Sequence, residues 1–582
     1  MAKHYLPQNA LLISQDDDRI RLQSCSSQEV RVWFTARTHQ LEMELLSVKN
    51  LYNSTLFITR IPTELFVEIL RLASPPHDVT WIATAMGVCR YWRDIIAATP
   101  LLWCAFTLLQ NVRFMELCLA RSNNTPISMD FRTDERFRRG PENNLSQVVE
   151  LMGSHISRLI RVDLRIDHLT SAKEPAIGRL LRSLESSLPR LTFMSLAVKA
   201  GFGLRVTAGR SLSFHGESLP AIRTIILSGV HISLNSVHIP HLTKLELHDI
   251  RHTDPDREDE FLSSLLDLLE RCVQLNEFKF TFERRIRRRA LVEQVVEASR
   301  IVSLPQMGLF ALSGLCTDIA SVMMHLSLPR RAALLLDATD GIVGTAGSGS
   351  RTPILEAVLP LHSTHSVALE KVHLARIFQR CDSLHISAKA VGTYGGEPTL
   401  RATYPLDRQS RLLRDAMLEL SSFLPSSLRT LIIHGTAVLI TSQDWRLSLS
   451  AFPQLKHLKI YDWSASRDNF HFASALEPRP SRTAVPCKRL RRVVLNYAPK
   501  TVDGTLSVFM NIQGALQKRA EVGSRLPELH VELRARVGNT GISQSSVNDA
   551  LRSSEAFNEL QRSLASVVGT VTIIWKDLAQ IA

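Results

Sequence analysis

The chain lacks long apolar runs, and this absence excludes a class of protein. Nowhere in its 582 residues is there an apolar stretch approaching the roughly 20 residues that a transmembrane helix needs. The short apolar segment at 10–13 is followed by acidic residues at 16–18, a pattern unlike that of a signal peptide. We therefore expect no membrane contact, and a location in the cytoplasm, the nucleus or both.

Clustered metal ligands and nucleophiles are also missing. The eight cysteines are scattered, without the spacing of a zinc site or a disulfide framework. Several of them occupy core-like positions: Cys89, Cys118, Cys272 and Cys381. The 20 histidines are dispersed, and pairs such as His362 and His365 have no carboxylate or cysteine pattern beside them. We expect buried, reduced thiols, no metal, no cofactor and no catalysis by this chain.

Aromatic residues are sparse, at 6%, whereas positive charge is plentiful, with a net charge of +13. The densest basic clusters lie at 136–139, 284–289 and 488–492, and none is accompanied by an aromatic stacking pattern or a nucleic-acid-reading motif. We therefore disfavour nucleic acid as a partner and interpret the clusters as solvated surface. The arginine run at 284–289 is the best candidate for a nuclear import signal or a contact with an acidic target.

Residues 61–103 are the most informative segment. Pro62 and Glu64 suit a first helical turn, and an apolar face follows at helical spacing until prolines at 75 and 76 end it. A second amphipathic segment covers about 81–97, and Pro100 closes it. Helices this short cannot bury an adequate core alone, so the module should lean on a partner or on the rest of the chain.

The ordered combination of these motifs resembles an F-box, the helical module that ties a substrate receptor to a ubiquitin ligase. The segments that carry the resemblance are Ile-Pro-Thr-Glu-Leu at 61–65, Val-Cys-Arg-Tyr-Trp-Arg at 88–93 and Pro-Leu-Leu-Trp at 100–103. In that family the module docks on a Skp-type adaptor, which binds a cullin. The resemblance implies adaptor-binding roles for Pro62, Leu65, Ile69, Leu70, Val88, Cys89, Trp92, Leu102 and Trp103. The chain as a whole is similar to the large F-box families of mushroom-forming fungi.

A strand-like signature recurs through the remainder, with apolar residues at its first, fourth and sixth positions. It occurs at 159–164, 191–196, 222–227, 242–247, 275–280 and 307–312, then at 428–433, 455–460 and 490–495. The interval of about 20–35 residues is typical of leucine-rich repeats. Prolines precede several units: Pro189, Pro220, Pro240, Pro305 and Pro453.

Helical patterns lie between the strand signatures, at 175–187, 256–272 and 409–423. Strand and helix alternation at this period predicts a solenoid with a parallel sheet on one wall, although a doubly wound α/β domain shares the alternation. The interval 317–427 is irregular: we expect strands at 334–336 and 384–387, a glycine-rich loop at 341–350 and a short helix at 352–359.

The N-terminal residues lack the patterns described above. Residues 1–34 have little periodicity and are expected to be disordered, whereas 35–57 show a helical stripe formed by Leu41, Leu45, Val48 and Leu51. This helix is expected to pack on the following module, although pairing with another helix is the alternative.

We therefore expect an α/β repeat protein, with a helical F-box at 58–104 and an irregular leucine-rich-repeat-like solenoid at 105–582. The resemblance implies a substrate-recognition subunit of a Skp-cullin-F-box ubiquitin ligase, with the adaptor on the F-box and an unknown target protein on the solenoid. Two alternatives remain open: a repeat scaffold whose F-box does not dock, and a basic nucleic-acid-binding protein.

Overall fold

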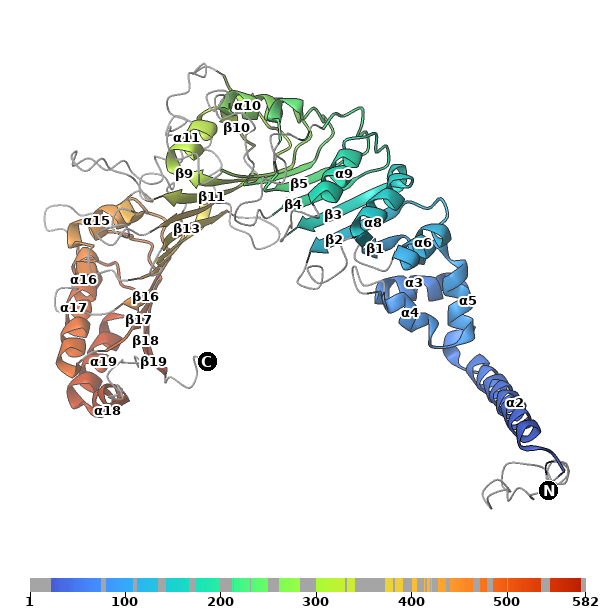
Figure 1. Cartoon of the computed structure of the whole chain (residues 1–582). Coiled ribbons are helices and arrows are strands. Elements are labelled where there is room, and N and C mark those ends of the chain that lie inside the picture. The colour runs from blue at the N-terminus through green and yellow to red at the C-terminus, as the bar shows by residue number, and fades with distance from the viewer. Residues whose placement is uncertain are drawn as a thin grey trace. The chain divides into compact units, whose positions relative to one another are not determined.

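The chain forms two compact units in the computed structural model (Figure 1). Unit 1 comprises Met1–Arg132 and Pro141–Leu159, and unit 2 comprises Thr133–Gly140 and Ile160–Ala582. The residues that the structure describes are 22, 24–74, 80–107, 112–133, 143–166, 174–198, 212, 214–230, 232–249, 261–282, 300–329, 332–340, 372–379, 383–390, 400–405, 413, 416–418, 420, 428–435, 440–463, 471–478, 485–499, 501–534 and 545–576.

Unit 1 begins, in its described part, with the long helix α2, Ser27–Ser54. A capping box fixes its start, because the Ser26 side chain accepts a hydrogen bond from the Glu29 backbone while the Glu29 carboxylate accepts one from the Ser26 backbone. Residues 27–34, for which the sequence predicts disorder, are therefore helical. No residue of α2 is buried, so the apolar stripe remains exposed instead of packing on the following module.

The helical module follows as η2 (Phe57–Arg60), α3 (Thr63–Ala73), α4 (Thr80–Met86), α5 (Arg90–Ala98) and η3 (Pro100–Trp103). The second amphipathic segment expected from the sequence is two helices. Gly87 and Val88 form a turn, in which the Gly87 N–H donates to the Ala83 carbonyl at 3.1 Å. Cys89 is extended, with φ −160°, and starts α5.

Unit 1 continues beyond residue 104, where the sequence predicts the end of the module. It adds β1 (Ala105–Thr107), α6 (Val112–Arg121), β2 (Ile127–Thr133), α8 (Asn143–Gly153) and η4 (Ile156–Arg158), with β1 parallel to β2. The Trp103 ring lies 6.4 Å from that of Phe114, and the Arg121 guanidinium lies 4.8 Å above Trp103. These contacts join α6 to the module.

Unit 2 is a succession of strands and helices. Its main sheet contains β3 (Leu159–Ile166), whose first residue belongs to unit 1, β4 (Phe193–Val198), β5 (Thr224–Ser228), β6 (Lys244–His248), β7 (Glu277–Thr281), β9 (Leu309–Leu315), β11 (Ala333–Asp340), β12 (Val372–Gln379), β13 (Ser383–Ala390), β14 (Leu400–Pro405), β15 (Thr430–His434), β16 (His457–Trp463), β17 (Arg492–Tyr497), β18 (Glu528–Arg534) and β19 (Thr570–Lys576). The short strands β8 (Val302–Ser303) and β10 (Leu326–Ser327) pair separately. The helices are α9 (Glu174–Leu184), η5 (Leu234–Ser236), α10 (Phe261–Arg271), α11 (Cys316–Met324), α15 (Ser442–Ser450), α16 (His471–Ala475), α17 (Val502–Glu521), α18 (Ser545–Ser553) and α19 (Glu555–Val567).

The predicted strand signature is confirmed as the repeating unit of this sheet. Its apolar positions are at most 3% exposed in every signature named above. The fourth positions align in parallel register from strand to strand, as Val162, Met194, Ile225, Leu245, Phe278 and Phe310. Equivalent residues therefore stack in rows, and each strand buries its apolar side chains against the next.

A tight turn precedes many of these strands, and it explains the recurrent proline. The backbone N–H of the first signature residue donates to the carbonyl three residues earlier at 3.1–3.3 Å, and proline is the second residue of the turn. Such turns occur at 188–191, 219–222, 239–242, 304–307 and 452–455. Proline suits that position because its fixed φ matches the turn and no N–H is required there.

The irregular interval continues the sheet but changes its order. After β11 the neighbouring strand is β14, followed by β13, β12 and then β15. β12, β13 and β14 form a meander, in which β13 is antiparallel to both of its neighbours. At the two sides of this meander, β12 is parallel to β15 and β14 is parallel to β11. The expected strands at 334–336 and 384–387 are confirmed within β11 and β13, while the predicted loop and helix at 341–359 lie outside the described residues.

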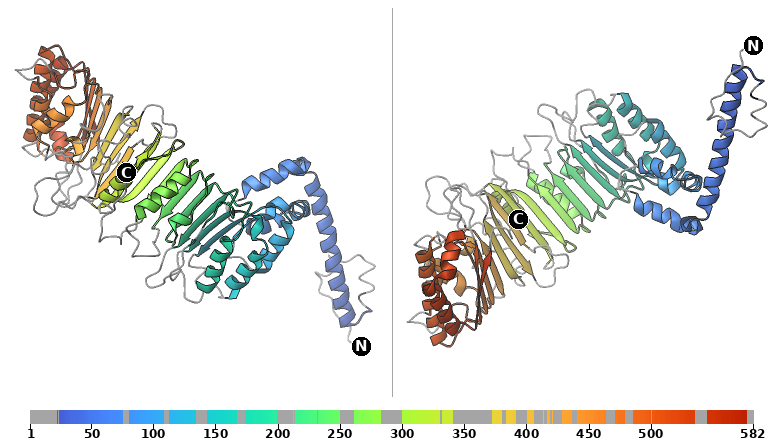
Figure 2. Two further views of the ribbon diagram at one scale, coloured as in Figure 1. Left: turned by 90° about the horizontal axis from the view of Figure 1, so that it is seen from above. Right: turned by 90° about the horizontal axis from the view of Figure 1, so that it is seen from below.

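The described helices α9, α10, α11, α15, α16, α17 and α19 lie along one side of the unit 2 sheet (Figure 1). Seen from above and below, the strands lie side by side along the unit (Figure 2). Helices on one face favour a repeat stack over the doubly wound alternative, which needs helices on both faces. The predicted helices at 175–187 and 256–272 correspond to α9 and α10. The described positions of the third, 413, 416–418 and 420, are helical.

Candidate partner-binding sites

The helical module of unit 1 has a small aromatic core. Phe66 and Ile96 are fully buried, and the Phe66 ring packs edge-on against Trp92 with centroids 5.0 Å apart. Trp103 is also fully buried, and its indole N–H donates to the Ile96 carbonyl at 2.7 Å. The polar atom of Trp103 is thereby satisfied, and this aromatic core holds α3, α5 and η3 together.

An apolar surface lies outside this core. Leu65, Ile69 and Leu72 of α3 are 58%, 45% and 72% exposed, at positions i, i+4 and i+7 on one side of the helix. Val88, in the turn before α5, is 57% exposed, and Leu101 of η3 is 60% exposed. We call these five residues the module surface. Exposed large apolar side chains at this density within one short module mark a protein-binding surface.

Charged residues occur beside the module surface. Glu68 and Arg71 of α3 form an ion pair at 2.7 Å. The hydrogen bond from Arg71 lowers the pKa of the Glu68 carboxyl, and the same bond raises the pKa of Arg71. Both side chains are about half exposed or more, so this pair adds solubility and orientation at the rim and contributes little to folding.

The structure separates the predicted adaptor-binding residues into two groups. Pro62, Leu65, Ile69 and Val88 are exposed and open to a partner, and Cys89 and Trp92 are half-buried. The remaining three are buried in the module itself, at 2%, 8% and 0% exposure: Leu70, Leu102 and Trp103. Their burial gives these three side chains a core role in the module, and their contact with an adaptor stays a prediction.

Two members of the module surface were missed as site residues. Leu72 continues the Leu65 and Ile69 stripe by one helical turn, so helical spacing alone was sufficient to include it. Leu101 precedes two buried residues of a 3-10 helix, and nothing in the sequence distinguishes the exposed leucine from its buried neighbour Leu102.

Two of the four cysteines that the sequence places in a core are buried, Cys118 and Cys272. Burial raises the pKa of Cys118 to about 12 and that of Cys272 to about 11, so both thiols stay protonated at neutral pH. Cys89, expected in a core, is half-buried, and Cys381 lies outside the described residues. The described residues contain no group of histidine, cysteine and acidic side chains arranged to hold a metal ion. None of the described helices has the length and apolar character to cross a membrane.

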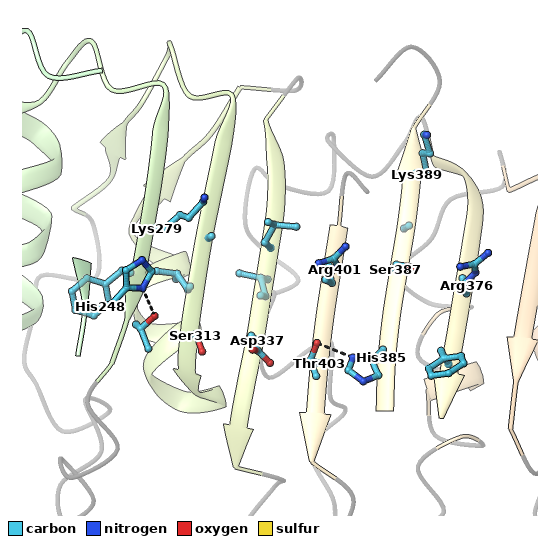
Figure 3. A pocket seen from close by; sticks show the side chains of 18 of the residues that line it. His248, Lys279, Ser313, Asp337, Arg376, His385, Ser387, Lys389, Arg401 and Thr403 are labelled. Carbon is cyan, nitrogen blue, oxygen red and sulfur yellow. Dashed lines mark hydrogen bonds between the residues drawn. The ribbon is translucent and has the colours of Figure 1, made fainter. Parts of the chain in front are cut away.

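A second candidate site lies within unit 2, on the sheet face away from the buried apolar rows. A hollow of about 880 Å³ extends from β6 across β7, β9, β11, β14 and β13 to β12 (Figure 3). Its lining combines apolar residues and one acidic residue, Asp337, with polar and basic residues of the middle of the sheet, including Lys279, Arg376, Lys389 and Arg401. The meander brings the last three together, although 25 residues separate Arg376 from Arg401 in the sequence.

Comparisons with known proteins bear on the helical module of unit 1. Among solved structures, the chain is similar to one described as the crystal structure of a TLR13–ssRNA13 complex, with 14% identity and a TM-score of 0.22 over 66% of this chain and 47% of that chain. The chain thus spans about half the length of that protein, and a likeness at this level supports no conclusion about ligand. A search of the curated proteins finds no match. Residues 58–108 match the family model described as F-box-like, so the helical module that carries the exposed apolar surface is an F-box-like domain.

Proposed function

We propose that this chain is the substrate-recognition subunit of a Skp-cullin-F-box ubiquitin ligase. The observation that supports this most is the coincidence of the F-box-like match at 58–108 with the module surface, whose leucine, isoleucine and valine side chains are left exposed. Such a surface is available to a Skp-type adaptor, and through it to a cullin.

In this proposal the chain itself is not catalytic. Unit 1 binds the adaptor, and the sheet of unit 2 binds a target protein, so the chain raises the effective concentration of target lysines near a ubiquitin carrier. A separate subunit supplies the covalent chemistry. We place the assembly in the cytoplasm or nucleus, where the ubiquitin ligases of this class work.

The adaptor contact is tested by Leu65→Asp combined with Ile69→Asp. Both side chains are about half exposed, so the module should still fold, whereas two carboxylates in a dry contact cost several kcal/mol. In a pull-down with a purified Skp-type adaptor, we expect recovery of the variant to fall to background.

The matched control is Leu46→Asp combined with Val48→Asp in α2, where the exposed fractions are 52% and 65%. This variant introduces the same charges outside the module surface and should be recovered like the parent. Equal recovery of both variants would disprove adaptor docking and leave a repeat scaffold with a non-docking F-box as the better description.

Nucleic-acid binding is the other alternative, and the described basic residues do not favour it. Lys488, Arg489 and Arg491 are exposed, as expected for solvated surface. The clusters at 136–139 and 284–289 lie outside the described residues. Binding that weakens steeply with salt and depends on those clusters would identify this alternative.

A further inference from the structure

The open face of the unit 2 sheet carries its side chains in straight rows, because equivalent residues are in register. One row runs through the strands around the hollow as Lys279, Ala311, Leu335, Arg401, Ser387, Arg376, Ile432 and Lys459. We call Arg401, Arg376 and Lys459 of this row the cation row. These three residues lie on every second strand, so their backbones are about 10 Å apart at ~4.8 Å per strand.

Charges on both sides of the cation row are neutralised within the sheet. On β6 and β7, Lys244 contacts Glu246 at 2.9 Å and Glu277 at 3.0 Å, and Lys279 contacts the same two carboxylates at 2.8 and 2.9 Å. On β17 and β18, Arg492 lies 3.5 Å from Glu528. Basic residues of these strands therefore have acidic partners built into the neighbouring strands.

The cation row has no such partner among the described residues. Arg376 and Arg401 are exposed and Lys459 is half-buried, and the described ion pairs and side-chain hydrogen bonds do not involve them. Figure 3 shows Arg401, Ser387 and Arg376 on three adjoining strands at the same height of the sheet. An anion above the Ser387 hydroxyl would be within reach of a guanidinium on either side.

The basic residues of this face affect the pKa of a neighbouring histidine. Burial lowers the pKa of His457, two residues before Lys459 on β16, and the charges of Lys459 and Arg492 lower it further. Like charges held near one another repel, so an anion that binds to this face is stabilised by attraction to them and reduces their mutual repulsion.

A row of rings runs beside the cation row on the same strands, formed by His385, Phe378, His434 and Tyr461. His434 and Tyr461 are stacked, with centroids 4.4 Å apart and planes inclined by 10°, and Phe378 lies 5.2 Å from His434 on the other side. Tyr461 therefore covers one face of His434, and Phe378 lies on its other side with the two ring planes inclined by 59°. Ring edges are electropositive and suit carboxylates, whereas a nucleic-acid base needs a free ring face.

We propose that the cation row and the ring row together bind an extended, acidic segment of a protein. The cation spacing of about 10 Å is close to one turn of an extended chain in the polyproline II conformation, three residues at ~3.1 Å per residue. Every third side chain of such a chain lies on the same side, so a carboxylate or phosphate at every third position would meet Arg401, Arg376 and Lys459 in turn. This inference deepens the proposed function, because it names the chemical class of target that the sheet of unit 2 recognises.

The test is direct binding of a fluorescein-labelled peptide, Glu-Ser-Gly repeated four times, to the purified full chain without adaptor, followed by fluorescence anisotropy. The variant replaces Arg376, Arg401 and Lys459 by glutamine. The matched control replaces Lys244, Arg492 and Arg534 by glutamine, which removes equal charge from the same face but from cations outside the hollow that already have acidic partners. We expect Kd to rise at least tenfold in the variant and less than threefold in the control. The variant should keep the parental melting temperature, whereas the control should melt somewhat lower because its ion pairs are lost.

Two outcomes would overturn the proposal. Equal weakening in the variant and the control would show that net charge alone attracts the peptide. Tighter binding of a deoxythymidine twelve-mer than of the peptide, dependent on the same three cations, would assign the face to nucleic acid. The peptide test is independent of adaptor docking. If the Leu65 and Ile69 variant loses the adaptor but still binds the peptide, both proposals are supported. If the adaptor does not bind even the parent chain, only the proposed ubiquitin-ligase role is disproved.

Discussion

Glu246 shows how a single residue sets the charge pattern of the unit 2 sheet. Its carboxylate is 12% exposed and lies within 2.9 Å of the Lys244 and Lys279 ammonium groups. A hydrogen bond from His248, with those from the two lysines, holds the pKa of Glu246 far below its usual value although burial opposes this. Together with Glu277, this carboxylate keeps both lysines paired, and of the two only Lys279 would otherwise extend the cation row.

Replacement of Glu246 by glutamine should lower the free energy of unfolding by about 1–3 kcal/mol at neutral pH. The change removes the more buried of the two carboxylates that pair with Lys244 and Lys279 and leaves both lysines to share Glu277. The folded pKa is lowered, so the carboxylate stabilises fully above the usual value of 4.5, and its contribution is lost as pH falls through the folded pKa. Urea unfolding at pH 7, 5 and 3.5 should show that the difference in unfolding free energy between parent and variant becomes smaller below about pH 4.5.

The control for this measurement is Glu528→Gln. Glu528 also pairs with a basic residue across strands, but its side chain is 55% exposed, and an exposed pair contributes about 0–1 kcal/mol. The stabilising role of Glu246 would be contradicted if Glu246→Gln lowers the free energy of unfolding no more than Glu528→Gln does. It would also be contradicted if the effect of Glu246→Gln becomes larger on acidification.

At the scale of elements, the turns between strands restrict the sequence as strongly as the core does. Gly229 follows β5 with φ of +66°, a left-handed conformation that other residues adopt with strain. A Cβ at this position would collide with the backbone carbonyl of Val198 at the end of β4. The two strands approach this closely because their register is fixed by the buried rows.

Gly229→Ala should therefore destabilise unit 2, by about 1–2 kcal/mol from the backbone conformation alone and further from the collision. Gly178→Ala in α9 is the matched change without either problem, since nothing lies within 4 Å of its added Cβ, and it should stabilise by up to about 1 kcal/mol through helix propensity. Melting temperatures should move in opposite directions, and a parallel shift in the two variants would refute the role of the turn.

Elements with a repeated pattern were predictable, and those determined by tertiary contacts were not. The six-residue signature predicted the buried rows from Leu159 to Leu495, because a buried parallel strand needs apolar residues at those positions whatever its neighbours are. The reversed strand β13 was not predictable in direction, since alternation of Leu384, Ile386 and Ala388 is the same in parallel and antiparallel pairing. The interruption between α4 and α5 at Gly87 was not predictable from the sequence, because both flanking helices continue one amphipathic pattern.

At the scale of the whole chain, the F-box-like site was predictable as a segment but not residue by residue. Family motifs mix residues that hold the module with residues that meet a partner, and only burial separates Trp103 from Leu65. The cation row was invisible in the sequence, because Arg376, Arg401 and Lys459 become neighbours only through the order of the strands. Dispersed positive charge in the sequence thus gave no sign of which cations lack partners.

The repeat architecture leads to the last prediction, which concerns how far a local defect spreads. Leu245 is 1% exposed on β6 and is in register with Ile225 of β5 and Phe278 of β7. Leu245→Asp buries a charge in the stacked row at a cost of several kcal/mol. In a repeat stack each unit is stabilised mainly by its immediate neighbours, so the loss should be greatest nearby and decline with distance along the sheet.

Hydrogen exchange followed by mass spectrometry should therefore show faster exchange in the peptides of β5, β6 and β7, with near-parental protection in those of β17, β18 and β19. Thr224→Ala is the control, because Thr224 occupies the neighbouring position of the register on the open face and is half-exposed. Lys244→Ala is unsuitable for this purpose, since its two ion pairs would be lost as well. Uniform loss of protection from β4 to β19 in Leu245→Asp would mean that unit 2 unfolds as one cooperative block, and the nearest-neighbour description would then fail.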